Sequence, residues 1–94
     1  MRVIFKYPLV PETWQNIIVP KNAEFLSVIV QEESIITYFK IDTDEKQTCK
    51  RLFGIFGTGH DCTKAKDLKF VGTVKLQEHL IFHIFIKPEE ADGN

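Results

Sequence analysis

Arg51-Leu52-Phe53-Gly54-Ile55-Phe56-Gly57-Thr58-Gly59-His60 is the stretch of this 94-residue chain around which the rest is organised. It reads as an apolar strand that runs directly into a glycine-rich turn ending in a histidine. Three glycines in six positions are more than a turn requires, because each one weakens a strand or raises the entropy of the unfolded loop. We therefore expect backbone with φ > 0, or close approach of another group, at these glycines.

The composition of the whole chain favours strands. Hydrophobic residues make up 44 % of it and aromatic residues 12 %, including eight Phe. Branched and ring side chains pack well on a pleated sheet, whereas alanine, the best helix former, occurs only three times. Ninety-four residues are enough for one domain with a hydrophobic core.

Outward from the central stretch, the sequence predicts strands at 2–6, 24–31, 35–41, 48–56, 69–76 and 80–87. The segment 13–19 fits a helical turn or a strand equally well, and 61–66 has room for one helical turn. The predicted fold class is all-β, a small antiparallel sandwich or barrel of about six strands. Residues 1–87 form the single β domain, and 88–94 are predicted to be a disordered acidic tail.

Alternation within these strands predicts which side chains share a face. Leu26, Val28 and Val30 fall on one face of their strand, opposite Phe25. A three-residue loop at 77–79 pairs Leu76 with Leu80, and the residues then predicted to share a buried face are Phe70, Val74, Phe82, Ile84 and Ile86. The strand 80–86 is apolar on both faces apart from His83, so we expect a second cover for it, supplied by another subunit.

Charge is unevenly distributed along the chain, whose net charge is −1. Residues 46–75 hold seven basic and two acidic side chains, a balance of +5. They form either a solvated surface or a positive patch for an anionic partner. The overall acidity argues against general nucleic-acid binding.

Location is predicted from what the sequence lacks. No segment approaches the ~20 apolar residues that span a membrane, and the first residues do not resemble a secretory signal. We therefore expect a cytoplasmic protein in which Cys49 and Cys62 are free thiols.

No set of residues in the sequence matches a known catalytic or metal motif. Cys49, His60 and Cys62 do not have zinc-site spacing, and the acidic loop 42–47 lacks the spaced oxygen ligands and the glycine of a calcium loop. Cys62 or Thr58 could act as a nucleophile with His60, but no third residue can be assigned as orienter. We expect no metal, no cofactor and no enzymatic activity.

The glycine turn is the most specific candidate site. Gly57, Thr58, Gly59 and His60 could present backbone N–H groups, a hydroxyl and an imidazole to a phosphate, with Lys50 and Arg51 adding positive charge. Arg51 shares the apolar face of its strand with Phe53 and Ile55, so it needs either a carboxylate partner or a bound anion. The alternative is a purely structural turn.

The chain resembles a group of short proteins from bacteriophages and prophages that is classed as a domain of unknown function. The resemblance rests on three segments, 53–60, 70–74 and 80–85, which read FGIFGTGH, FVGTV and LIFHIF. It extends over nearly the full length and implies a phage accessory protein that works in the host cytoplasm.

Two functions follow from this setting. In the first, a non-enzymatic homo-oligomer sequesters an anionic nucleotide signal of host defence, with ligand sites between subunits. In the second, the domain masks the surface of a host or phage protein, and the glycine turn is only structural.

Overall fold

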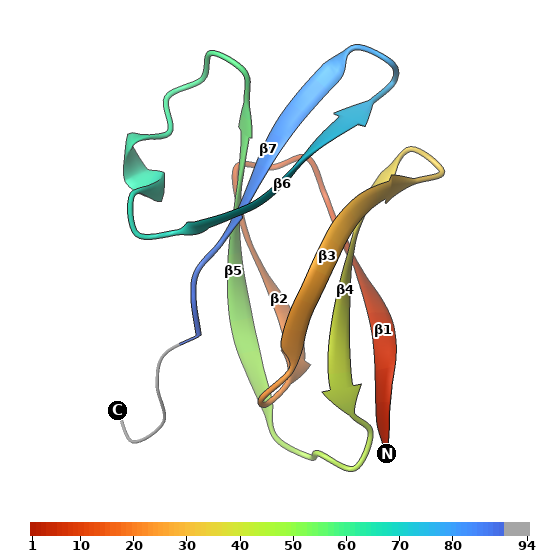
Figure 1. Ribbon diagram of the computed structural model, residues 1–94. Helices are drawn as coiled ribbons and strands as arrows, with labels where there is room; N and C mark the ends of the chain where they lie inside the picture. The colour runs from red at the N-terminus through yellow and green to blue at the C-terminus, as the bar shows by residue number, and fades with distance from the viewer. Residues whose placement is uncertain (90–94) are drawn as a thin grey trace.

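Within residues 1–89 the protein is an antiparallel β-sandwich of seven strands, which confirms the all-β prediction and selects the sandwich over the barrel. The computed structural model describes residues 1–89. One sheet has three strands, in the order β1 (Arg2–Leu9), β4 (Ser34–Asp42) and β3 (Glu24–Gln31). The other has four, in the order β2 (Trp14–Pro20), β5 (Thr48–Gly57), β7 (Leu80–Ile86) and β6 (Lys69–Leu76) (Figure 1).

The strand β2 accounts for the difference from the predicted six, because the ambiguous segment 13–19 pairs with β5. A single 3-10 turn, η1 (Thr63–Ala65), lies in the connection between β5 and β6, as the sequence allowed. The predicted disordered tail 88–94 lies outside the described residues from residue 90 onward. No helix within residues 1–89 is long and apolar enough to cross a membrane.

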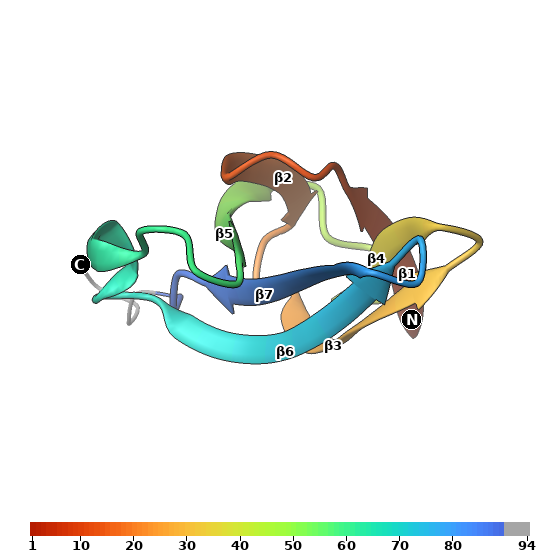
Figure 2. The same ribbon diagram turned by 90° about the horizontal axis from the view of Figure 1, so that it is seen from above.

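The hydrophobic core lies between the two sheets. Phe39 of β4 and Phe53 of β5 are completely buried, and their ring centroids are 6.4 Å apart. Phe25 of β3 contacts both rings at 5.5 and 6.0 Å. Along one side of the sandwich β3 lies beside β6, as the view from above shows (Figure 2). Gly72 permits this approach, because a Cβ atom there would be 2.9 Å from the Val28 side chain.

Two β-bulges overturn two of the predicted face assignments. The register of β3 shifts between Phe25 and Ser27, so Phe25 packs against the core and Leu26 is exposed. The register of β6 shifts between Phe70 and Gly72, which turns Phe70 outward and brings Val71 against the core instead. A bulge adds one residue to a strand, so every residue before it changes face relative to strict alternation.

The predicted pairing at the β6–β7 hairpin is correct. Leu76 pairs with Leu80 and Val74 with Phe82. The turn between these strands places Gln77 and Glu78 at φ of 51° and 65°, the left-handed region that L-residues other than glycine and asparagine rarely adopt. The β3–β4 turn does the same with Glu32 and Glu33.

The glycines of the central stretch meet the expectation drawn from the sequence. Gly59 has φ of 87°, and it is the only glycine in the described residues with positive φ. Gly54 and Gly57 instead allow a neighbouring aromatic or imidazole ring to approach the backbone closely. A Cβ atom on Gly54 would be 2.9 Å from the Phe56 ring, and one on Gly57 would be 2.8 Å from the His60 ring.

Candidate binding face

The solvent-side face of the four-stranded sheet, called the outer face below, carries a continuous row of aromatic rings. The register places Trp14, Gly54, Phe85 and Phe70 opposite one another across β2, β5, β7 and β6. Phe56 lies two residues beyond Gly54 on β5. Consecutive ring centroids from Trp14 to Phe56, Phe85 and Phe70 are 5.5, 5.7 and 5.5 Å apart, each pair edge to face. We call these four rings the aromatic row.

The two ends of the aromatic row are open to solvent, whereas its middle is buried at Phe56 and half-buried at Phe85. Trp14 is 39 % exposed and Phe70 is 51 % exposed, whereas Phe56 is 5 % exposed. Gly54 leaves room for these side chains, because Trp14, Phe56 and Leu68 all lie within 3.1 Å of where its Cβ would be. The outer face of β7 is therefore partly covered by the chain itself.

The four-stranded sheet carries no negative charge. None of its four strands contains Asp or Glu, whereas the three-stranded sheet contains Glu24 and Asp42. Lys50 of β5 and Lys75 of β6 alternate onto the outer face, in register with Ile18 and Ile81. An anion that approaches this face meets lysines and no carboxylate from the strands.

His83 lies on the outer face directly beside the aromatic row, in register with Phe56. The hydroxyl of Thr58 is 2.8 Å from its Nε2 atom, and the hydroxyl of Thr73 is 3.0 Å from its Nδ1 atom. With both ring nitrogens engaged, the imidazole is fixed in orientation and links the middle of β6 and β7 to the turn that follows β5. A threonine hydroxyl can both donate and accept, so this arrangement is compatible with either tautomer of the ring.

The Thr58–His83 pair has the spacing of a nucleophile and its base. The group on the other side of the imidazole is the neutral hydroxyl of Thr73, which cannot stabilise a positively charged ring as a carboxylate does. The geometry therefore suits a rigid hydrogen-bonding site better than acyl or phosphoryl transfer. Among residues 1–89 no group of three or more His, Cys, Asp or Glu side chains is placed to hold a metal ion. Cys49 and Cys62 are free thiols.

The residues predicted to form the glycine-turn site do not all come together. The Thr58 hydroxyl is hydrogen-bonded to the His83 side chain, and the backbone N–H of His60 donates to the Gly57 carbonyl at 3.1 Å. Both donors therefore have partners within the chain. Lys50 lies on the outer face of β5, eight residues before Thr58, which follows the end of the strand. Since a strand advances ~3.3 Å per residue, the two are more than ~20 Å apart.

Arg51 points away from this face into the core. It is 8 % exposed, its Nη1 atom donates to the Ala23 carbonyl at 3.3 Å, and its guanidinium lies 5.6 Å from the centre of the Phe39 ring. No carboxylate within the described residues forms an ion pair with it. The expected carboxylate partner is thus replaced by a backbone carbonyl and an aromatic face.

The loop that follows the glycine turn holds a local hydrogen-bonded structure. Asp61 accepts bonds from the Thr63 hydroxyl at 2.6 Å and the Thr63 N–H at 2.9 Å. The hydroxyl contributes most to lowering the pKa of the Asp61 carboxyl below its usual range. Asp61 is therefore a fixed negative charge at neutral pH, just past the turn, and it weakens the case for an anion bound at His60.

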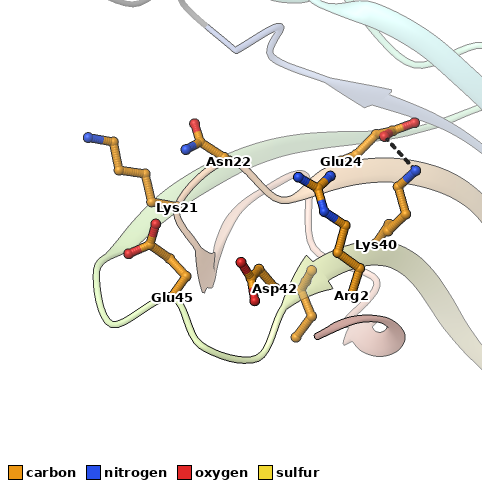
Figure 3. Close-up of a pocket in the computed structure, with 8 residues that line it drawn as sticks. Arg2, Lys21, Asn22, Glu24, Lys40, Asp42 and Glu45 are labelled. Carbon is orange, nitrogen blue, oxygen red and sulfur yellow. Dashed lines mark ion pairs between the residues drawn. The ribbon is translucent and has the colours of Figure 1, made fainter.

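A pocket of about 130 Å³ lies at the other end of the sandwich (Figure 3). Charges of both signs line it: Arg2, Lys21 and Lys40 with Glu24, Asp42 and Glu45. Lys40 forms an ion pair with Glu24 at 3.3 Å, marked by the dashed line in Figure 3. Because its cations and carboxylates are equal in number, this pocket offers an anion little net attraction, and we favour the outer face as the binding site.

A comparison with known protein families identifies the family of the chain. A family model described as a domain of unknown function (DUF7352) matches residues 1–94. The chain belongs to the DUF7352 family. No curated protein and no solved structure matches it.

In this DUF7352 chain, three residues of the outer face carry little signal in the amino-acid sequence. Trp14 lies in a segment whose strand and helix patterns were equally good. His83 was the one polar side chain within the apolar run 80–86, and that interruption is the signal that could have marked it. Thr73 carries no signal of its own, because its role depends on pairing with a histidine ten residues away.

Proposed function

We propose that the protein is a non-enzymatic binder of a nucleotide or a similar anion that carries an aromatic base, and that it binds this ligand on the outer face. One observation carries the proposal. An aromatic row with two solvent-exposed ends lies on a sheet whose strands contain lysines but no carboxylate.

Each part of that observation corresponds to a part of the ligand. Exposed Trp and Phe rings offer flat surfaces on which bases stack regardless of their identity. Lysines attract phosphate, and the absence of carboxylates from the strands removes the repulsion that a phosphate would otherwise meet. The threonine hydroxyls around His83 add hydrogen-bonding atoms beside the aromatic row.

The biological setting of this proposal comes from the resemblance to phage proteins. A small protein that binds a nucleotide without converting it would act as a sponge, lowering the free concentration of a nucleotide signal in the host cytoplasm. Assembly into a homo-oligomer would add ligand sites in proportion to the number of subunits.

A protein partner is the competing occupant of the outer face. Trp and aromatic side chains dominate the energetics of many protein interfaces, and Trp14 and Phe70 are exposed enough to act as anchors. A protein surface that masks this face would have to supply acidic residues opposite Lys50 and Lys75.

Trp14 provides the test, because it is the only tryptophan in the chain. Its fluorescence is followed at low salt during titration with nucleoside mono- and diphosphates. We expect saturable quenching that weakens with added salt. Phe70→Ala should weaken binding, whereas Ile29→Ala, which truncates a comparably exposed residue on the three-stranded sheet, should not.

Two results would count against the proposal. Absence of any saturable change with the whole panel would contradict nucleotide binding and favour the protein partner. Equal loss of binding in Phe70→Ala and Ile29→Ala would place the ligand elsewhere on the molecule. Light scattering on the same samples measures the oligomeric state.

A further inference from the structure

We infer that the ligand of the outer face carries two bases joined through phosphate, one stacked on Trp14 and the other on Phe70. This inference rests on the proposed function and specifies its ligand. The chemistry is shared by a cyclic dinucleotide and by a short single strand, and the experiment below separates the two.

The spacing of the exposed rings carries the inference. Trp14 and Phe70 belong to the two edge strands of the four-stranded sheet, β2 and β6, and they occupy one cross-strand row. Neighbouring strands are ~4.8 Å apart, so three intervals separate the two residues by ~14 Å. Stacked bases in a duplex strand are only ~3.4 Å apart. A single base on Trp14 therefore leaves Phe70 uncovered.

The middle of the aromatic row cannot take a base in the same way. Phe56 is 5 % exposed, and it is held edge to face by both Trp14 and Phe85. The row thus has two exposed stacking platforms, connected by the buried ring of Phe56 and the half-buried ring of Phe85. A ligand that uses both platforms needs two unstacked bases held apart by a linker, as in single-stranded recognition.

Linking the two bases should strengthen binding by more than the contacts of either one alone. Once the first base is stacked, the second is held close to its platform, and the linker sets a high effective concentration. A mononucleotide has no such gain. The affinity should therefore rise sharply between one base and two.

The experiment compares thymidine monophosphate, the linear dinucleotide TpT, the hexanucleotide dT6 and a cyclic dinucleotide, by Trp14 fluorescence and calorimetry on the full chain. We expect the best two-base ligand to bind at least tenfold more tightly than the monophosphate. Phe70→Ala should weaken binding of that ligand at least tenfold, a clearly larger loss than the weakening that the same change causes for the monophosphate. Ile29→Ala is the matched control and should change neither.

The outcomes separate this inference from the proposed function. Preference for the cyclic dinucleotide over TpT and dT6 identifies a cyclic signal, and the reverse order identifies a single strand. If the monophosphate binds as tightly as every two-base ligand, the two-platform inference is wrong and the proposed function stands. If none of the four binds, both are wrong.

Discussion

Gly54 shows at the scale of one residue why a glycine occupies the middle of a buried strand. Its Cα faces the space that the rings of Trp14 and Phe56 and the side chain of Leu68 fill. Because Phe56 is buried, its ring cannot move aside to admit a methyl group. We expect Gly54→Ala to lower the free energy of unfolding by about 1–3 kcal/mol, as overpacking does, and to shift the Trp14 emission.

Gly59→Ala is the matched comparison. Nothing lies near its Cβ position, but its φ of 87° disfavours any L side chain, at a cost of about 1–2 kcal/mol. Urea unfolding followed by circular dichroism measures both variants. The Trp14 emission should change only in Gly54→Ala, and an unchanged spectrum there would mean that Trp14 does not lie over Gly54.

Arg51 is a buried cation whose long aliphatic stem is expected to contribute more to stability than its charge. Its guanidinium has only the Ala23 carbonyl and the Phe39 ring as partners among the contacts of residues 1–89. Replacing a poorly paired buried charge by an apolar side chain of similar length is often neutral or stabilising. We expect Arg51→Met to stay within about 1 kcal/mol of the wild-type free energy of unfolding.

Arg51→Ala removes the stem as well and should cost about 2–5 kcal/mol, the range for truncating large core residues. Chemical denaturation compares the two variants. If Met costs as much as Ala, the positive charge itself is required, and a bound anion at Arg51 becomes the better explanation.

At the scale of an element, the β6–β7 hairpin has a turn whose residues do not suit its backbone. Gln77 and Glu78 both have positive φ, a pattern for which Asn-Gly is preferred. We expect the double change Gln77→Asn and Glu78→Gly to stabilise the protein by about 1 kcal/mol, which raises the Tm of a domain of this size by about 4–8 °C.

The β3–β4 hairpin supplies the control, since Glu32 and Glu33 have the same backbone geometry. There the Glu33 carboxylate accepts a hydrogen bond from the Gln77 N–H at 2.8 Å, which joins the two turns. Glu32→Asn with Glu33→Gly should therefore raise the Tm less than the first pair of changes. Calorimetric scans of both variants give the comparison, and a fall in Tm for the 77–78 variant would contradict the turn assignment.

At the scale of the whole molecule, the sandwich depends on the aromatic contacts between its sheets. Phe53 is fully buried and touches Phe39 and Phe25 of the opposite sheet. Phe53→Ala should cost about 3–5 kcal/mol in free energy of unfolding. Phe82 also faces the core but is only half-buried, so Phe82→Ala should cost less. Denaturant unfolding measures both, and the reverse order would move the centre of the core toward β7.

Much of the fold could be predicted from the sequence because strand patterns are local. The alternation in 24–31, the apolar run 48–56 and the three-residue loop at 77–79 each depend on neighbouring residues. The two bulges could not be predicted, since the extra residue in a bulged strand fits only in relation to its partner strand. Phe25 and Phe70 were placed on the wrong face for this reason.

The candidate site was harder to predict because it depends on contacts distant in sequence. Thr58 was identified, but its partner His83 lies 25 residues away. Arg51 and the glycine turn are close in sequence, yet the strand that joins them holds them apart and gives Arg51 and Lys50 opposite faces. Spacing along a strand separates residues, and only the pairing of strands brings site residues together.

The order of strands in the two sheets has a consequence for how the chain folds. β1 pairs with β4, and β2 pairs with β5, so the first two strands have no partner nearby in sequence. The hairpins β3–β4 and β6–β7 are local and can form early, whereas the first twenty residues must wait until residues 34–57 are available. During synthesis β1 and β2 leave the ribosome first and remain unpaired longest. Slow folding and early exposure of Trp14 are therefore built into the topology.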